Sequence, residues 1–178
     1  PYDAASLTIT VTGTSRAKAT DGLTDTVESW DIEPDGAALS QAEVGIPDGQ
    51  SMTRDSPGDV PASVIQLTKQ ISDGIDQPAL KAAAIQAYLR SSRFTYSVQG
   101  ANGQTSYAAM ESFLLTSKTG YCVQFASSMA LMARIAGIPS RVAVGFLPGT
   151  KSGDTWMVTS HDMHAWPELY FEGQGWVR

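Results

Sequence analysis

The chain contains a single cysteine, Cys122, whose position suggests a nucleophile. It follows the pair Gly120-Tyr121 and begins a segment with helical periodicity that ends at Gly137. The first turn of a helix presents unpaired N–H groups and a partial positive charge, and both favour a thiolate over a thiol. A lone cysteine is more often a small buried apolar residue. The nucleophile hypothesis therefore requires a base elsewhere in the chain.

Two histidines, His161 and His164, are available as that base. The segment from residue 164 to 171 alternates like a β-strand, with one apolar side (Ala165, Pro167, Leu169, Phe171) and one polar and aromatic side (His164, Trp166, Glu168, Tyr170). We expect the apolar side to pack on the core and the other side to form a cleft wall. His164 is therefore the predicted base, because it would stabilise a thiolate and later protonate the leaving amine. His161 is predicted to lie on the surface.

An imidazole base needs a carboxylate or amide to hold its orientation. Glu168 is four strand residues from His164, which is about 13 Å at about 3.3 Å per residue, and this is too far for a hydrogen bond. Asp162 is two residues from His164, about 6.6 Å at the same rise, and reaches it only in an awkward geometry.

The neighbouring strand offers a better place for this third residue. Residues 172–175, Glu-Gly-Gln-Gly, resemble a tight hairpin turn, so the chain from Trp176 should return antiparallel to residues 164–171. The residue opposite His164 would then lie a few positions beyond Arg178. We expect the orienting acid just after this chain.

The overall composition limits the class of protein. The chain has 178 residues, of which 42% are hydrophobic and 17% charged, as in a globular domain with one buried core. A net charge of −6 without a basic cluster argues against nucleic acid or anionic lipid as a partner. A single cysteine excludes an internal disulfide, and we find neither a membrane-spanning segment nor a signal peptide. Because the chain starts at Pro1 and stops within a strand-like run, we expect it to be part of a longer protein.

The chain is predicted to have two parts. Residues 1–60 form a β-rich segment of uncertain role, with a half-exposed strand over residues 7–12, and residues 61–178 form the catalytic core. In the core we predict helices from Pro61, over 78–91, over 107–115 and from Cys122, and strands over 94–98, 141–147, 156–159, 164–171 and from Trp176. Helices followed by consecutive strands predict an α+β domain, with an antiparallel sheet packed on the cysteine helix.

Three separated motifs resemble the transglutaminase-like superfamily, which has a papain-like cysteine-enzyme fold. They are GYCVQFASSMALMARIAGIPSR, HAWPELYF and GW, in that order. The resemblance extends over residues from roughly 80 to 178 and implies that Cys122 is the nucleophile and His164 the base. It also implies an aspartate just past Arg178 as the third member. Bacterial members whose domain lies outside the cytoplasmic membrane, between transmembrane segments, look most similar.

The resemblance further implies acyl transfer without a cofactor. Cys122 would attack a glutamine side chain of a protein or peptide, releasing ammonia and forming a thioester that an amine or water resolves. The N–H of Cys122 is the expected first donor to the oxyanion. Tyr121, Trp156 and Trp166 are candidates for oxyanion contacts or cleft walls, and the alternative for each is a plain core or surface aromatic residue.

Three other interpretations stay open. A peptidase or amidase would use the same residues with water as the acceptor. A zinc site made of Cys122, His161 and His164 would lack a fourth ligand, and its two histidines would face opposite ways on a strand. A non-catalytic binding domain would keep the fold alone. Arg141 is predicted to form a buried or half-buried ion pair that orients the sheet edge.

Overall fold

The protein is seen here in a computed structural model that describes residues 2–3, 8–9, 34–47, 53, 58–99 and 106–178. The chain divides into two compact units, residues 1–32 and residues 33–178. Two short antiparallel strands are described in the first unit, β1 (Tyr2–Asp3) and β2 (Thr8–Ile9). The strand predicted over residues 7–12 thus coincides with β2 at two positions, and its other residues lie outside the described part.

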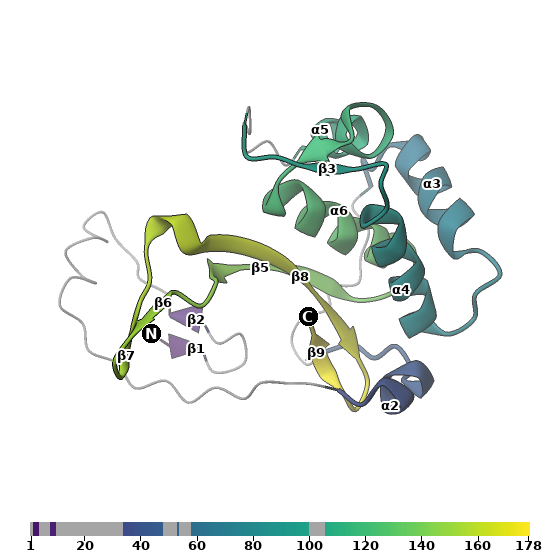
Figure 1. The fold of residues 1–178 in the computed structure, drawn as a ribbon. Helices are drawn as coiled ribbons and strands as arrows, with labels where there is room; N and C mark the ends of the chain where they lie inside the picture. Colours follow the sequence, from purple (N-terminus) through teal and green to yellow (C-terminus); the bar gives the residue numbers. More distant parts are fainter. Residues whose placement is uncertain (1, 4–7, 10–33, 48–52, 54–57, 100–105) are drawn as a thin grey trace. The chain divides into compact units, whose positions relative to one another are not determined.

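Helices come first in the second unit and form most of its core (Figure 1). They are α2 (Gly36–Gln41), α3 (Ala62–Ser72), α4 (Pro78–Leu89), α5 (Tyr107–Ser112) with its π-helical continuation η2 (Phe113–Ser117), and α6 (Cys122–Ile135). The helices predicted from Pro61, over 78–91, over 107–115 and from Cys122 are therefore confirmed.

The short helix α2 was not predicted, because residues 36–41 lie in the segment expected to form strands and loops. Asp35 caps this helix by accepting a hydrogen bond from the N–H of Ala37 at 3.3 Å. Leu39 then packs against the hydrophobic core of the second unit. A six-residue helix is too short to show helical periodicity in the sequence. The role of residues 1–60 as a separate segment stays a prediction.

The second unit also contains a three-stranded antiparallel sheet in the order β5–β8–β9. Its strands are β5 (Ser140–Phe146), β8 (Met163–Phe171) and β9 (Gly175–Val177). Tyr170 faces Trp176 across β8 and β9, which confirms the hairpin predicted at residues 172–175. The strand predicted at 156–159 is β7 (Thr155–Met157), which forms a separate hairpin with β6 (Thr150–Ser152). A 3-10 turn, η3 (Ser160–Asp162), leads into β8.

A short parallel pair links the middle of the chain to the start of α6. It joins β3 (Thr95–Tyr96) to β4 (Thr119–Gly120). The N–H of Ser97 donates to the carbonyl of Gly120 at 2.8 Å, and the N–H of Thr95 donates to the carbonyl of Lys118 at the same distance. The strand predicted over 94–98 therefore lies beside the residues that lead into the cysteine helix.

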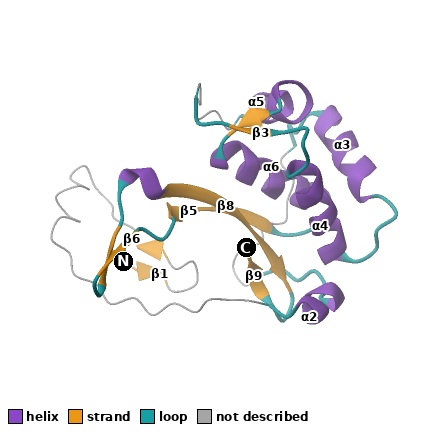
Figure 2. Ribbon diagram, in the orientation of Figure 1, coloured by secondary structure: helices purple, strands orange, loops and turns teal. Residues whose placement is uncertain are grey.

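The core is built around α6, which runs alongside β8 and packs against α3, α4 and β5 (Figure 2). The middle of the helix is buried on all sides, because its buried residues are Ala126 and the unbroken run from Ser128 to Ala133. The helix ends at Ile135, and Gly137, just after the C-cap, has a φ of 85° that favours glycine. Ser140 then ties the helix to β5, because its hydroxyl donates to the carbonyl of Ala130 at 2.6 Å. No helix in the described ranges is long and apolar enough to cross a bilayer.

Candidate active site

Cys122 is the first residue of α6 and is half-buried. The helix start is set locally, because the side chain of Gln124 accepts a hydrogen bond from the N–H of Tyr121 at 3.2 Å. Gly120 makes a close approach just before it: a Cβ there would lie 2.9 Å from Cβ of Gln124 and 3.0 Å from the ring of Phe113. A larger residue would push the chain out of place. Packing thus fixes where Cys122 enters the helix.

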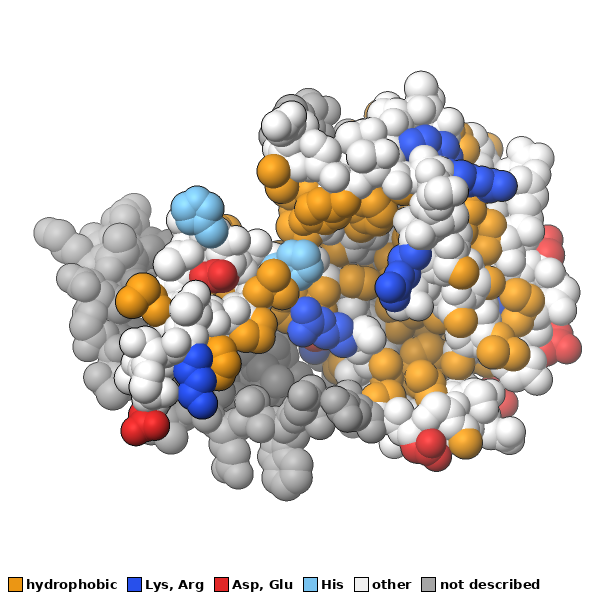
Figure 3. Space-filling model, in the orientation of Figure 1, with side chains coloured by type: hydrophobic (Ala, Val, Ile, Leu, Met, Phe, Trp, Pro, Cys, Tyr) orange, Lys and Arg blue, Asp and Glu red, His pale blue; other side chains and the backbone are white. Residues whose placement is uncertain are grey.

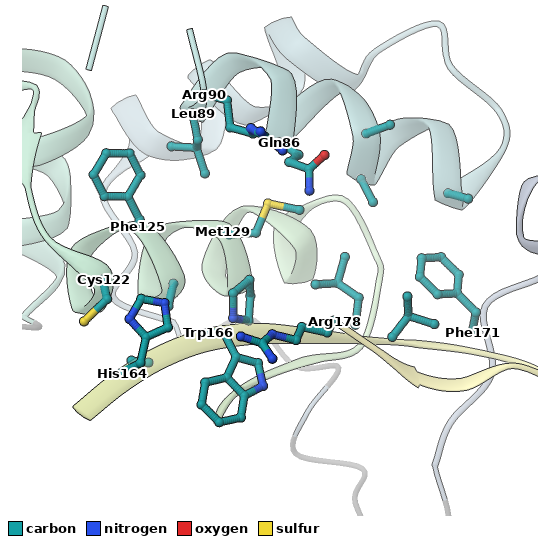
Figure 4. Close-up of a pocket in the computed structure, with 18 of the residues that line it drawn as sticks. Gln86, Leu89, Arg90, Cys122, Phe125, Met129, His164, Trp166, Phe171 and Arg178 are labelled. Carbon is teal, nitrogen blue, oxygen red and sulfur yellow. The ribbon is translucent and has the colours of Figure 1, made fainter. Parts of the chain in front are cut away.

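His164 reaches the same place from the sheet. It lies in β8 opposite Gly145 of β5, and its half-buried imidazole stacks on Trp166 with 6.5 Å between ring centroids. Cys122 and His164 both line one cavity, and Figure 4 shows the imidazole beside Cys122 at one end of it. The structure therefore brings together the two residues predicted to be nucleophile and base.

The other histidine and the nearby acid have different positions. His161 is exposed on η3, and its backbone N–H donates to the hydroxyl of Thr159 at 3.3 Å. The carboxylate of Asp162 accepts from the N–H of Thr159 at 2.7 Å, and this hydrogen bond is the main reason why the pKa of Asp162 is lowered. Asp162 is thus engaged in capping η3.

The cavity has a volume of about 410 Å³ and lies between α4, α6 and β8. Figure 3 shows apolar side chains gathered around the hollowed part of this face. Figure 4 shows Cys122 and His164 at one end of the cavity and Phe171 at the other, with Arg90 and Arg178 also beside it. An apolar channel that leads to a cysteine and a histidine suits an extended substrate better than a small polar one.

The cavity wall differs from the strand face that we predicted. Residues from both sides of β8 line the cavity, including Ala165 and Leu169 as well as His164 and Trp166, whereas Glu168 is not among the lining residues. In the described part of the sheet, β9 pairs with β8 only at residues 169–171. Residues of both faces of β8 therefore reach the cavity.

Arg141 and Glu168 form the half-buried ion pair that the sequence predicted for Arg141. The Nε of Arg141 lies 2.6 Å from Oε2 of Glu168, and its guanidinium lies 4.1 Å from the ring centroid of Trp176. The indole of Trp166 donates to Oε1 of Glu168 at 3.1 Å. These contacts join β5, β8 and β9 through side chains as well as through the backbone. They also hold the indole that stacks on His164.

Tyr96 also lies in the site, although it was not predicted from the sequence. It lines the cavity, and its ring stacks on Phe125 with 6.0 Å between centroids. The pKa of Tyr96 is raised above its usual value, first by partial burial and then by the negative charge of Cys122, while the N–H of Cys122 acts in the opposite direction. The strand at 94–98 was predicted, but its pairing with residues 119–120 leaves no local trace in the sequence.

The three aromatic candidates occupy different positions. Trp166 lines the cavity, and the guanidinium of Arg178 lies 4.7 Å from its ring centroid. Tyr121 caps the N-terminus of α6 and is absent from the cavity lining among the described residues, as is Trp156. Trp156 lies on β7 with 58% of its surface exposed.

In the residues that the structure describes, no three His, Cys, Asp or Glu side chains are grouped so that they could hold a metal ion.

Helices followed by an antiparallel sheet, with a cysteine at a helix start facing a histidine on a strand, define a papain-like cysteine-enzyme fold. The chain belongs to the transglutaminase-like superfamily, whose family model matches residues 65–178. This superfamily includes cysteine enzymes. The match begins within α3, covers the later helices and the whole β5–β8–β9 sheet, and includes both Cys122 and His164.

Individual relatives agree with this assignment. The chain is 34% identical over 128 residues to the uncharacterized protein YebA of Bacillus subtilis (strain 168), covering 68% of this chain. It is 31% identical over 117 residues to a protein-glutamine gamma-glutamyltransferase of Pseudomonas aeruginosa, covering 62% of this chain. It spans 17% of the length of each of these two proteins.

A solved structure also matches the fold. The periplasmic domain of TgpA from Pseudomonas aeruginosa superposes with a TM-score of 0.63 and 28% sequence identity. The match covers 70% of this chain and 43% of the TgpA chain. The resemblance to a papain-like transglutaminase core is therefore shown by sequence and by structure.

Proposed function

We propose that this chain is the catalytic core of a cysteine acyltransferase that acts on glutamine carboxamides of proteins or peptides. One observation carries the proposal: Cys122 and His164 lie together at one end of an apolar cavity. Cys122 is the first residue of α6, and His164 lies on β8. The similarity to a protein-glutamine gamma-glutamyltransferase supports glutamine as the acyl donor.

The reaction begins with a proton on His164 and a thiolate on Cys122. The sulfur forms a bond to the carboxamide carbon, and the carbonyl electron pair moves to the oxygen, which becomes the oxyanion. When the carbonyl re-forms, the C–N bond breaks and His164 gives its proton to the leaving nitrogen, which departs as ammonia. The thioester then reacts with a primary amine, whose proton passes to His164, and Cys122 is released as a thiolate.

We place the residue that orients His164 on a continuation of β9. Leu169 pairs with Val177, and five residues back along β8 correspond to five residues forward along β9. The position facing His164 would then be the fourth residue after Arg178. An acid there would accept a hydrogen bond from the imidazole and hold its tautomer. This agrees with the contacts of Asp162 and Glu168, whose carboxylates are bonded to Thr159 and Arg141.

The proposal also includes the location of the protein and the kind of substrate that it binds. Similarity to a periplasmic domain supports a location outside the cytoplasm, within a membrane-anchored parent protein. The apolar lining of the cavity supports substrates in which apolar residues flank the reactive glutamine. Water in place of the amine would make the same site a hydrolase, so the acceptor is the property to test.

The test offers a glutamine-containing peptide with and without a labelled primary amine, and measures ammonia release and amine incorporation. We expect both signals from the unsubstituted protein, and neither from Cys122→Ala or His164→Ala. His161→Ala is the matched control, because this exposed histidine lies outside the cavity, and it should keep both signals. Ammonia release without incorporation would establish a hydrolase instead. Absence of both from the unsubstituted protein would overturn the proposal.

A further inference from the structure

The residue that stands out beyond the nucleophile and base is Tyr96, which the fold holds at the start of α6. In the parallel pair of β3 and β4, Tyr96 faces Gly120, two residues before Cys122. The hydrogen bond from the N–H of Ser97 to the carbonyl of Gly120, at 2.8 Å, fixes this register on the side of the cysteine. The backbone of Tyr96 is therefore tied to the segment that delivers Cys122 into the helix.

The side chain of Tyr96 is held by an aromatic cluster. Its ring stacks on Phe125 at an interplanar angle of 28°, and Phe125 is one turn of α6 after Cys122. Phe125 packs in turn against Phe94 and Phe113, with centroid distances of 6.0 Å and 5.0 Å. One face of the ring is thus packed on Phe125, while 57% of the Tyr96 surface is exposed. A phenol supported in this way has a defined position but remains accessible to a substrate in the cavity that it lines.

Both the side chain and the backbone of Cys122 affect the pKa of the Tyr96 hydroxyl. The pKa of Tyr96 is raised by partial burial, by the negative charge of Cys122 and by a hydrogen bond with its side chain, and is lowered by a hydrogen bond with its backbone. Tyr96 is therefore electrostatically coupled to Cys122, in the cavity that both residues line. A phenol that keeps its proton beside a thiolate is a hydrogen-bond donor throughout the neutral pH range.

These two groups of Cys122 also define where an oxyanion forms. The carbon attacked by the sulfur carries the oxyanion, and the N–H of the nucleophile at a helix start is its natural first donor. A second donor must reach the same small region. Of the three aromatic residues that the sequence offered for this place, Trp166 lies on β8 beyond His164, and neither Tyr121 nor Trp156 lines the described cavity.

We propose that the hydroxyl of Tyr96 is the second hydrogen-bond donor to the oxyanion, beside the N–H of Cys122. The inference rests on the proposed acyl transfer and names a further catalytic residue for it. In the resting site the ring of Tyr96 and the side chain of Cys122 line the same cavity. During attack on a carbonyl it donates to the oxygen that has taken the electron pair of the C=O bond, and it keeps its own proton. When the carbonyl re-forms, the hydrogen bond weakens and the leaving group departs.

Two reactions of the Cys122 sulfur distinguish an oxyanion donor from a residue that acts on the thiolate or on the fold. Acylation by p-nitrophenyl acetate forms a tetrahedral oxyanion, whereas alkylation by iodoacetamide displaces iodide and forms none. We expect Tyr96→Phe to slow the burst of nitrophenolate by about 100-fold, the effect of losing one oxyanion donor. The alkylation rate should stay within about threefold, because the phenyl ring still stacks on Phe125. Tyr107→Phe, which removes a phenol outside this cavity, should change neither rate.

Each other outcome has a clear meaning. An unchanged or faster burst in Tyr96→Phe would overturn the inference, since the hydroxyl would then be a bystander or an obstacle. Equal losses in acylation and alkylation would also overturn it, because the hydroxyl would then act on the thiolate or on the fold. Absence of a burst from the unsubstituted protein would overturn the proposed function itself and the inference with it.

Discussion

The two elements that bring the proposed nucleophile and base together are held in different ways. Seven residues of α6 are buried, and helices and strands pack around it on several sides. β8 is buried at Ala165, Leu169 and Phe171, but at its His164 end Met163 is 58% exposed. On the neighbouring strand, Val144 and Phe146 are 74% and 55% exposed. On β8, exposure is therefore confined to Met163, at the end next to His164, and the neighbouring part of β5 is exposed as well, whereas α6 is packed for most of its length.

This difference assigns separate tasks to the two elements. The place of Cys122 is set by close packing at Gly120 and along α6, so it should be insensitive to changes on the sheet. His164 depends on the pairing of β8 with β5 and on its contact with Trp166, which Glu168 holds. The sheet end of the site should therefore tolerate substitution of exposed apolar residues without loss of global stability.

The largest effect should come from emptying the core of α6. Met132 is fully buried, so Met132→Ala should lower the free energy of unfolding by about 2–5 kcal/mol through lost burial and a residual cavity. Val144→Ala, at the exposed end of β5, should change it by less than about 0.5 kcal/mol. Urea unfolding followed by circular dichroism measures both values. Equal losses of unfolding free energy in the two variants would contradict the difference in packing between α6 and the exposed end of β5.

A smaller loss is expected where the chain enters α6. An added methyl in Gly120→Ala meets Phe113 and Gln124, so we expect about 1–3 kcal/mol of destabilisation, together with slower alkylation of the displaced Cys122. The control is Gly36→Ala, whose Cβ would meet nothing within 4 Å. Thermal unfolding and iodoacetamide labelling report the two effects. If Gly120→Ala behaved like its control, close packing would not position the cysteine.

The smallest effects are expected at two serines, Ser140 and Ser128, which are both fully buried. The hydroxyl of Ser140 donates to Ala130 at 2.6 Å, whereas that of Ser128 has no hydrogen-bond partner among the described residues. Ser140→Ala should therefore cost about 0.5–1.5 kcal/mol of unfolding free energy. Ser128→Ala should be neutral or slightly stabilising, because it removes an unpaired buried hydroxyl. Chemical denaturation of both variants distinguishes them, and a larger loss for Ser128→Ala would reveal a partner for its hydroxyl.

Much of the fold could be predicted because its signals are local. Apolar residues at helical spacing indicated α6, the turn residues 172–175 indicated the β8–β9 hairpin, and strict alternation indicated β8. The short helix α2 escaped because six residues give too little periodicity. Its stabilising contact is tertiary, through Leu39 against the core.

The site was predictable to a lesser degree. Cys122 and His164 were identified by residue type and by their place on a helix and a strand. Tyr96 was missed because a parallel pair between residues 95–96 and 119–120 depends on long-range packing. The cavity wall was assigned to one face of β8, but residues of both faces contribute to it. Strand alternation predicts on which face of a strand a side chain lies, but not which side chains of each face a cavity reaches.

The central claim is that His164 keeps Cys122 as a reactive thiolate. Its most direct test is the rate of iodoacetamide labelling at pH 6, where an ordinary cysteine with a pKa of about 8.5 is only about 0.3% thiolate. We predict labelling about 10-fold or more faster than for free cysteine, a marked loss in His164→Ala, and no change in His161→Ala. Labelling at the rate of free cysteine in both the unsubstituted protein and His164→Ala would contradict the claim.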